Sequence, residues 1–220
     1  MVALNWQDCD KGMMINEGMF AGTGGYVLKP PSYRGDTMRQ QPQTHTMDLH
    51  IEVFAGQNLA LPADKQHESD FHPWVKSSLH VETLEGKFGN STSKMAQQPK
   101  LKVHTVHGQG RNPSFSSRAG QGAVLTYRNV TVDEEQLCFV RLKVVDKDRM
   151  AKDDLAAWSC IRLDRLREGL RIVRLWDASG ASYGGLLLVK VSKVFKGEQV
   201  DGLVQAHSGM TGREMQLPYV

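Results

Sequence analysis

The sequence predicts an all-β fold, an eight-stranded antiparallel β-sandwich, and two observations support this. From Met47 onward, short segments of alternating apolar and polar residues are separated by turns, and no long helical pattern interrupts them. Side chains alternate between the two faces of a strand, so each segment buries one face and the strands pack as two sheets. We expect strands at 47–54, 74–83, 100–106, 123–130, 137–145, 157–163, 172–176 and 185–195.

The chain divides into four stretches. Residues 1–34 hold a short apolar strand, a segment of helical character at 13–20 and a glycine-rich turn, and they are too few to bury their own apolar faces. Residues 35–46 are polar and predict a linker. The sandwich occupies 47–196, with a long polar loop at 85–99, and residues 197–220 lack periodicity and predict a flexible tail.

Composition restricts the classes of function. The net charge of +3, from 27 basic and 24 acidic residues, is too small and too evenly spread to indicate nucleic acid as a partner. Cys9, Cys138 and Cys160 form no CxxC pair, which favours a reducing cytosolic setting over a zinc or redox centre. No apolar run approaches the ~18–20 residues that span a bilayer, so we expect any membrane contact to be peripheral.

Two blocks of sequence carry a family resemblance. The opening VALNWQDCDKGMMINEGMFAGTGGYVLKP, at 2–30, resembles the end of the Y half of the catalytic barrel in phosphoinositide-specific phospholipases C, and its wording is similar to the fungal branch. LHIEVFAGQNL, HPWV, FVRLKVVDKD and GGLLLVKVSKVF resemble the C2 domain that follows this barrel in the family. The resemblance implies a terminal remnant of a TIM barrel at 1–34 and a C2-type sandwich at 47–196.

The resemblance also implies a function. The family hydrolyses phosphatidylinositol 4,5-bisphosphate to diacylglycerol and inositol trisphosphate, using two histidines and a calcium ion in the first half of the barrel. No histidine of this sequence matches that motif, so we expect no catalytic residue here and no activity from the chain alone. The chain would supply barrel closure and membrane docking, with the upstream barrel half and an anionic phospholipid surface as partners, in the cytoplasm and peripherally at membranes. The alternative is a standalone, non-catalytic, C2-type phospholipid-binding module.

A barrel remnant without its neighbouring strands leaves apolar faces and backbone groups unpaired. We therefore expect residues 2–30 to be poorly ordered, or to pack loosely on the sandwich, when this chain is made alone.

The resemblance places calcium ligands in loops at one end of the sandwich. The candidate ligands are Asp146, Asp148, Asp154 and Asp70. Asp153, beside Asp154, could substitute for it, and Asp64 is the alternative to Asp70 as a ligand from the first loop. Where the family has Asp-Pro, this sequence has His72-Pro73, and imidazole is a poor ligand for calcium, which takes six to eight oxygens. Two interpretations stay open, a calcium site and a solvated acidic loop.

A second candidate membrane element is basic. Lys100, Lys102 and His104 alternate with Leu101 and Val103, so they project from one face of a strand. Each basic side chain near an anionic leaflet contributes ~1 kcal/mol. This pattern predicts weak lipid binding, and its alternative is an ordinary solvated strand face.

Overall fold

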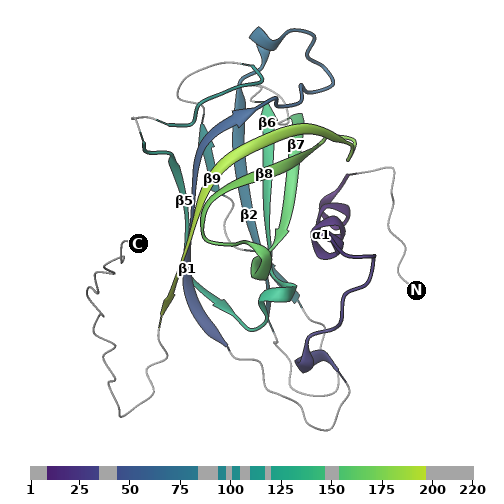
Figure 1. Ribbon diagram of the computed structural model, residues 1–220, viewed down its shortest axis with the longest axis vertical. Helices are drawn as coiled ribbons and strands as arrows, with labels where there is room; N and C mark the ends of the chain where they lie inside the picture. Colours follow the sequence, from purple (N-terminus) through teal and green to yellow (C-terminus); the bar gives the residue numbers. More distant parts are fainter. Residues whose placement is uncertain are drawn as a thin grey trace, which may run out of the picture.

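The computed structural model describes residues 9–34, 44–83, 94–97, 101–104, 110–116, 120–146 and 154–196. Within these ranges the chain forms one α-helix, four short 3-10 helices and nine strands (Figure 1). The helix is α1 (Lys11–Phe20), and the 3-10 helices are η1 (Pro31–Tyr33), η2 (Glu68–Asp70), η3 (Glu135–Leu137) and η4 (Leu163–Arg165). The strands are β1 (His45–Gln57), β2 (Pro73–Thr83), β3 (Lys94–Gln97), β4 (Leu101–His104), β5 (Ala123–Val132), β6 (Phe139–Asp146), β7 (Asp154–Arg162), β8 (Gly169–Asp177) and β9 (Ser182–Lys196).

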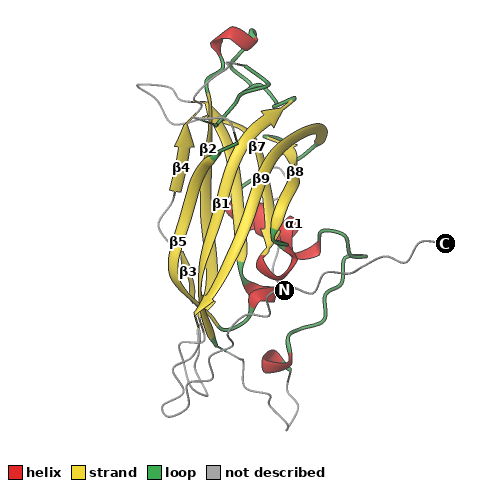
Figure 2. Cartoon of the chain, turned by 60° about the vertical axis from the view of Figure 1, so that its left-hand side comes forward, coloured by secondary structure: helices red, strands yellow, loops and turns green. Residues whose placement is uncertain are grey.

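The strands form two layers joined at one corner. Hydrogen bonding follows the order β3-β2-β6-β7-β8-β9-β1-β5, with β4 also paired to β2, and each pair that is described is antiparallel. The corner is the short β7–β8 ladder, where the partners are Ala157 with Asp177 and Trp158 with Trp176. The path folds back on itself there, so β2, β6 and β7 face β8, β9, β1 and β5 (Figure 2).

The predicted fold class is confirmed. Each of the eight expected strands has a counterpart among β1, β2 and β4–β9. The expectation of an unstructured loop at 85–99 is wrong in part, because Lys94–Gln97 forms the short strand β3 against the far end of β2. With only four residues, KMAQ, this strand is too short for an alternating pattern to reveal it.

The core lies between the layers, as the alternation in β6 requires. Val140, Leu142 and Val144 are buried in the main core cluster, whereas Phe139 and Arg141 are buried on the other face of the strand, beneath α1. One polar contact crosses the core: the Tyr127 hydroxyl on β5 and the Ser77 hydroxyl on β2 are 2.9 Å apart.

Helix α1 is preceded by an N-cap residue, Asp10, and is followed by a turn that contains glycine. The Asp10 side chain accepts a hydrogen bond of 2.8 Å from the Met13 backbone N–H, which satisfies one of the free donors of the first turn. Gly22, just after the helix, has φ +67°, a conformation that costs glycine little. The expected helical segment at 13–20 is therefore present, and it begins two residues earlier than expected.

The helix packs closely on the outer face of β6 and β7. Met14 is 1% exposed and forms a second apolar cluster with Phe139, Trp158 and Cys160. Gly18 approaches so near that an added Cβ would lie 2.9 Å from the Cys160 sulfur and 3.0 Å from the Cys160 carbonyl oxygen. The expectation that the opening segment packs loosely is wrong for residues 11–20. The helix backbone packs closely against an apolar strip on the outer face of the sheet.

Candidate functional site

Two of the candidate metal ligands lie side by side at one end of the sandwich. Asp146 ends β6 and Asp154 begins β7, and they are direct cross-strand partners. Asp146 also pairs with Pro73 at the start of β2, next to His72. Asp148 and Asp153 lie outside the described residues. The end of the sandwich defined by Asp146 and Asp154, with the β1–β2 loop at 58–72, is called the acidic end below.

Both oxygens of Asp146 are already engaged. Its Oδ1 accepts a 2.9 Å hydrogen bond from the His72 backbone N–H, and its Oδ2 lies 3.3 Å from the Nζ of Lys65. The same Nζ lies 3.4 Å from Oδ2 of Asp64. The hydrogen bond to Asp146 is the main cause that raises the pKa of Lys65 above its usual value, so this ammonium stays charged.

The first-loop candidate stands apart from this pair. Asp70 is exposed on η2, where its Oδ1 accepts a hydrogen bond from the Ser69 hydroxyl. The described ranges contain no group of three or more His, Cys, Asp or Glu side chains placed to hold a metal ion. Asp146 and Asp154 carry two oxygens each, fewer than the six to eight that calcium takes.

The β1–β2 loop is held in place by the segment at 110–116. Backbone hydrogen bonds join Leu59 N–H to the Arg111 carbonyl at 2.8 Å and Gly110 N–H to the Phe71 carbonyl at 2.9 Å. The Arg111 Nε–H returns a 2.8 Å bond to the Leu59 carbonyl. Leu59 and Phe71 are fully buried, so the loop that presents Lys65 has its own apolar anchors.

A second site is a row of lysines across three strands. Lys102 on β4 is the cross-strand partner of Lys76 on β2, which in turn partners Lys143 on β6. Lys76 and Lys143 are partly exposed and alternate with the buried, core-facing Val75 and Val144. We call Lys76, Lys102 and Lys143 the lysine row. Strand pairing therefore brings three lysine positions from separate strands into one cross-strand row.

The predicted lipid-binding residues meet this row only in part. Lys102 belongs to it, His104 is the partner of Trp74 further along the same ladder, and Lys100 lies outside the described residues. The side chains on β4 are also outside the description, so the lipid-binding role of these three residues stays a prediction. Sequence analysis missed Lys76 and Lys143, since only the strand pairing brings them beside Lys102.

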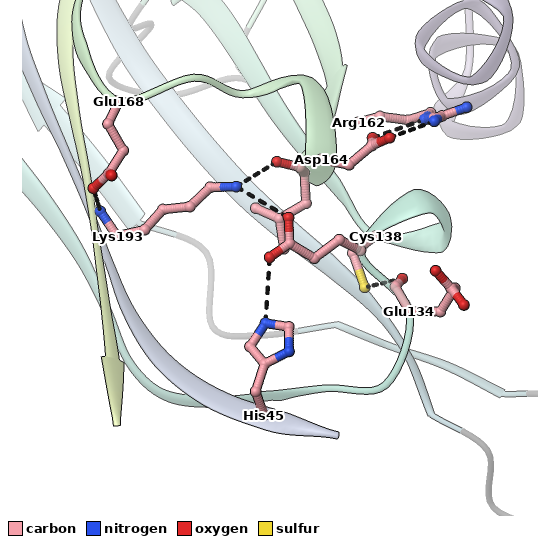
Figure 3. A network of polar contacts seen from close by, with 9 residues as sticks. His45, Glu134, Cys138, Arg162, Asp164, Glu168 and Lys193 are labelled. Atoms are coloured by element: carbon pink, nitrogen blue, oxygen red, sulfur yellow. Dashed lines mark hydrogen bonds and ion pairs between the residues drawn. The ribbon is translucent and has the colours of Figure 1, made fainter. Parts of the chain in front are cut away.

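The polar network at the other end of the sandwich has a structural role. The Lys193 ammonium on β9, 9% exposed, donates to the Leu163 carbonyl at 2.6 Å and to Glu135 at 3.1 Å (Figure 3). Glu135 also lies 3.3 Å from Nε2 of His45 (Figure 3). The Glu168 carboxylate accepts a 2.6 Å bond from the Lys193 backbone N–H. The network holds η3 and η4 against β1 and β9. Its hydrogen-bond donors are directed at acceptors within the protein.

Two further observations bear on the kind of protein. No helix in the described part of the chain is long and apolar enough to cross a bilayer. Cys9, Cys138 and Cys160 do not form disulfides in the described part of the chain. Fold and surface together define a C2-type β-sandwich that carries a packed helical segment before its first strand.

Comparison with known proteins identifies that segment. Residues 1–32 match the family model "Phosphatidylinositol-specific phospholipase C, Y domain". The human 1-phosphatidylinositol 4,5-bisphosphate phosphodiesterase delta-1 is 28% identical over 87% of this chain and 24% of its own length. The Candida albicans 1-phosphatidylinositol 4,5-bisphosphate phosphodiesterase 1 is 23% identical over 82% of this chain and 18% of its own length. The crystal structure of L. pealei PLC21 superposes with a TM-score of 0.63 at 19% identity, over 90% of this chain and 23% of that one.

These findings confirm the resemblance found in the sequence. Residues 1–32 match the Y domain, and most of the chain is similar to the C-terminal portion of phosphoinositide-specific phospholipases C, which comprises the end of the Y half of the barrel and the C2 domain after it. It spans about a quarter or less of the length of these relatives.

Proposed function

We propose that this chain docks a phosphoinositide phospholipase C on anionic membranes and contributes no catalytic side chain itself. The parent protein hydrolyses phosphatidylinositol 4,5-bisphosphate to diacylglycerol and inositol trisphosphate, acting peripherally at membranes from the cytoplasm. The lysine row is the observation that carries the docking role. The fungal assignment belongs to the same proposal, supported by the Candida albicans relative.

The lysine row suits a phospholipid surface by its geometry. Direct cross-strand partners have Cβ atoms about 4.5–5.5 Å apart, so the pairing of β4, β2 and β6 gathers three lysine positions on one line of the sheet. Each lysine near an anionic leaflet contributes ~1 kcal/mol, which corresponds to about a fivefold change in affinity. Lys100 and His104 would extend the same face at the β4 edge.

Co-sedimentation with vesicles tests the docking role. We expect the chain to pellet with phosphatidylcholine vesicles that contain phosphatidylserine and phosphatidylinositol 4,5-bisphosphate, and not with phosphatidylcholine alone. Lys76→Gln and Lys143→Gln should each weaken binding about fivefold, and Lys190→Gln, on the exposed face of β9, should change it little. Equal losses for the three variants would show that net charge, and not the lysine row, governs binding.

The upstream barrel half is the proposed protein partner. Helix α1 belongs to the Y-domain match and is already packed on the sandwich. Trp158, beneath α1, stacks on Trp176 with ring centroids 6.2 Å apart, and the same face of β8 continues to exposed Leu170 and Ile172. Exposed apolar side chains therefore lie on β8 beside the α1 contact, interrupted by Arg174, and further barrel segments would bury them.

The presence of an upstream barrel half would distinguish this proposal from the alternative, a standalone lipid-binding module. Sequencing the transcript should reveal, in frame before Val2, the half of the barrel that carries the two catalytic histidines. The protein that includes both halves should hydrolyse the lipid, and the present chain should release no inositol trisphosphate. Hydrolysis by this chain alone would overturn the assignment of catalysis to the upstream half.

The proposed docking does not require calcium. A calcium ion at the acidic end would have to displace Lys65 from Asp146 and recruit further oxygens. We therefore propose that docking through the lysine row proceeds equally in calcium and in chelator. Binding to vesicles that disappears when calcium is chelated would contradict this.

A further inference from the structure

We propose that the Lys65 ammonium is a built-in substitute for a divalent cation at Asp146, so that this buried carboxylate is paired without calcium. This inference is independent of the lipid-docking role, because it concerns only the occupancy of one carboxylate.

Asp146 is a carboxylate that needs a positive partner. Its side chain is only 3% exposed, and it lies at the end of a core strand directly opposite another carboxylate, Asp154. A buried carboxylate is strongly unfavourable unless it is paired and hydrogen-bonded. Like charges on opposed strand positions add to the cost. The acidic end therefore requires a cation, whatever its source.

Lys65 meets this requirement from within the chain. Its Nζ lies 3.3 Å from Asp146 and 3.4 Å from Asp64, so one ammonium bridges two carboxylates. The His72 backbone N–H takes the other oxygen of Asp146. Each oxygen of Asp146 thus has one donor, and the charge of the Lys65 ammonium repels a metal ion from the lone pairs that remain.

The backbone around Lys65 favours this placement. The Lys65 N–H donates to the Pro62 carbonyl at 3.1 Å, which closes a turn directly before the lysine. Buried Leu59 and Phe71 anchor the two ends of the loop. A long side chain loses rotamer freedom when it is held, and a preset backbone reduces the number of conformations to be lost. The Lys65 side chain is only 24% exposed to solvent.

A matched ion pair lies at the opposite end of the sandwich. Lys196 lies 3.0 Å from Asp48, but the lysine is 42% exposed and the aspartate 16%. Exposed pairs of this kind contribute little, since water solvates either partner when the other is removed. Lys196→Gln therefore controls for the loss of one lysine–aspartate pair without a buried carboxylate.

Thermal unfolding of the full chain with calcium or chelator tests the inference. We expect the melting temperatures of the native chain and of Lys196→Gln to be the same in both. In chelator, Lys65→Gln should melt at a lower temperature than the native chain. When the calcium concentration is about a hundredfold above the dissociation constant, the melting temperature of Lys65→Gln should rise by roughly 5–10 °C. The double variant Lys65→Gln/Asp146→Asn should lose this gain, because the carboxylate that would bind the ion is gone.

Two outcomes would overturn the inference. A calcium-dependent rise in the native chain as large as that in Lys65→Gln would show that Lys65 excludes nothing. The absence of any rise in folded Lys65→Gln would show that the lysine does not occupy a cation position.

A second measurement needs no variant and so survives a failure of Lys65→Gln to fold. Brief acetylation followed by mass spectrometry reports the reactivity of each lysine amine in the native chain. Lys65 should react several-fold more slowly than Lys190, and calcium should leave its rate unchanged. Faster acetylation of Lys65 in calcium would mean that the ion displaces it, and would overturn the proposal.

Discussion

Replacing Gly18 with alanine should push α1 away from the sheet. The added Cβ would lie 2.9 Å from the Cys160 Sγ and 3.0 Å from the Cys160 carbonyl oxygen. A sulfur at the tip of a side chain can yield, but the carbonyl is part of the β7 backbone and cannot. The helix must therefore retreat by about half an ångström or more to restore ordinary contact distances.

The size of the effect follows from two opposed contributions. Overpacking of a close contact costs about 1–3 kcal/mol, and alanine is a better helix former than glycine by about 1 kcal/mol. We expect a net loss of about 0–2 kcal/mol in the free energy of unfolding, or a melting temperature lower by up to roughly 8 °C. The loss has an upper limit, because complete detachment would expose Met13 and Met14 at about 1.5–3 kcal/mol each.

Hydrogen exchange and thermal unfolding measure this effect separately. Amide protection in Lys11–Phe20 should fall in Gly18→Ala, and the protection of β1 and β9 in the other layer should stay unchanged. Gly24→Ala is the matched control, since no atom lies within 4 Å of the position that its Cβ would take, and its stability should stay within about 0.5 kcal/mol of the native value. A Gly18→Ala chain with native stability and full protection of α1 would refute the close packing of this helix.

Three further changes probe the sandwich itself. Lys193→Met should lower the free energy of unfolding by about 1–3 kcal/mol, because its sheltered acceptors lose their donor, while Lys190→Met on the exposed face should stay within about 0.5 kcal/mol in urea unfolding. Tyr127→Phe removes the hydrogen bond to Ser77 between the layers and should cost about 0.5–1.5 kcal/mol; an unchanged urea midpoint would argue against that contact. Burial raises the pKa of Cys160 from 9.0 to about 12, so the thiol ionises in the unfolded chain before it does in the folded chain. Stability should therefore be fully present below pH 9 and fall as the pH rises towards 12, less steeply in Cys160→Ala.

The alternation of apolar and polar residues within single strands was sufficient to predict the β-sandwich. In β6 the alternation of Val140, Leu142 and Val144 with Arg141 and Lys143 assigns the faces correctly, because the side-chain period of a strand is independent of its partners. The end of the sandwich at which Asp146 and Asp154 meet also follows from the sequence, since an antiparallel connection returns to the edge it left.

The features missed by sequence analysis depend on contacts between distant segments. Lys65 lies in a loop whose sequence gives no sign that its amine reaches Asp146 on another strand. The lysine row exists only in the register of β4, β2 and β6, which no single strand encodes. The close docking of α1 depends on Gly18, because a missing side chain allows the approach and leaves no apolar signal in the sequence.

The most direct test of the docking role is a footprint of lysine acetylation on the native chain, free and bound to vesicles of phosphatidylcholine, phosphatidylserine and phosphatidylinositol 4,5-bisphosphate. If the outer face of β4, β2 and β6 meets the lipid, Lys76, Lys102 and Lys143 will lose reactivity on binding, and Lys190 on β9 will keep it. Protection of Lys190 with unchanged Lys76 and Lys143 would place the membrane on the opposite layer and contradict docking through the lysine row.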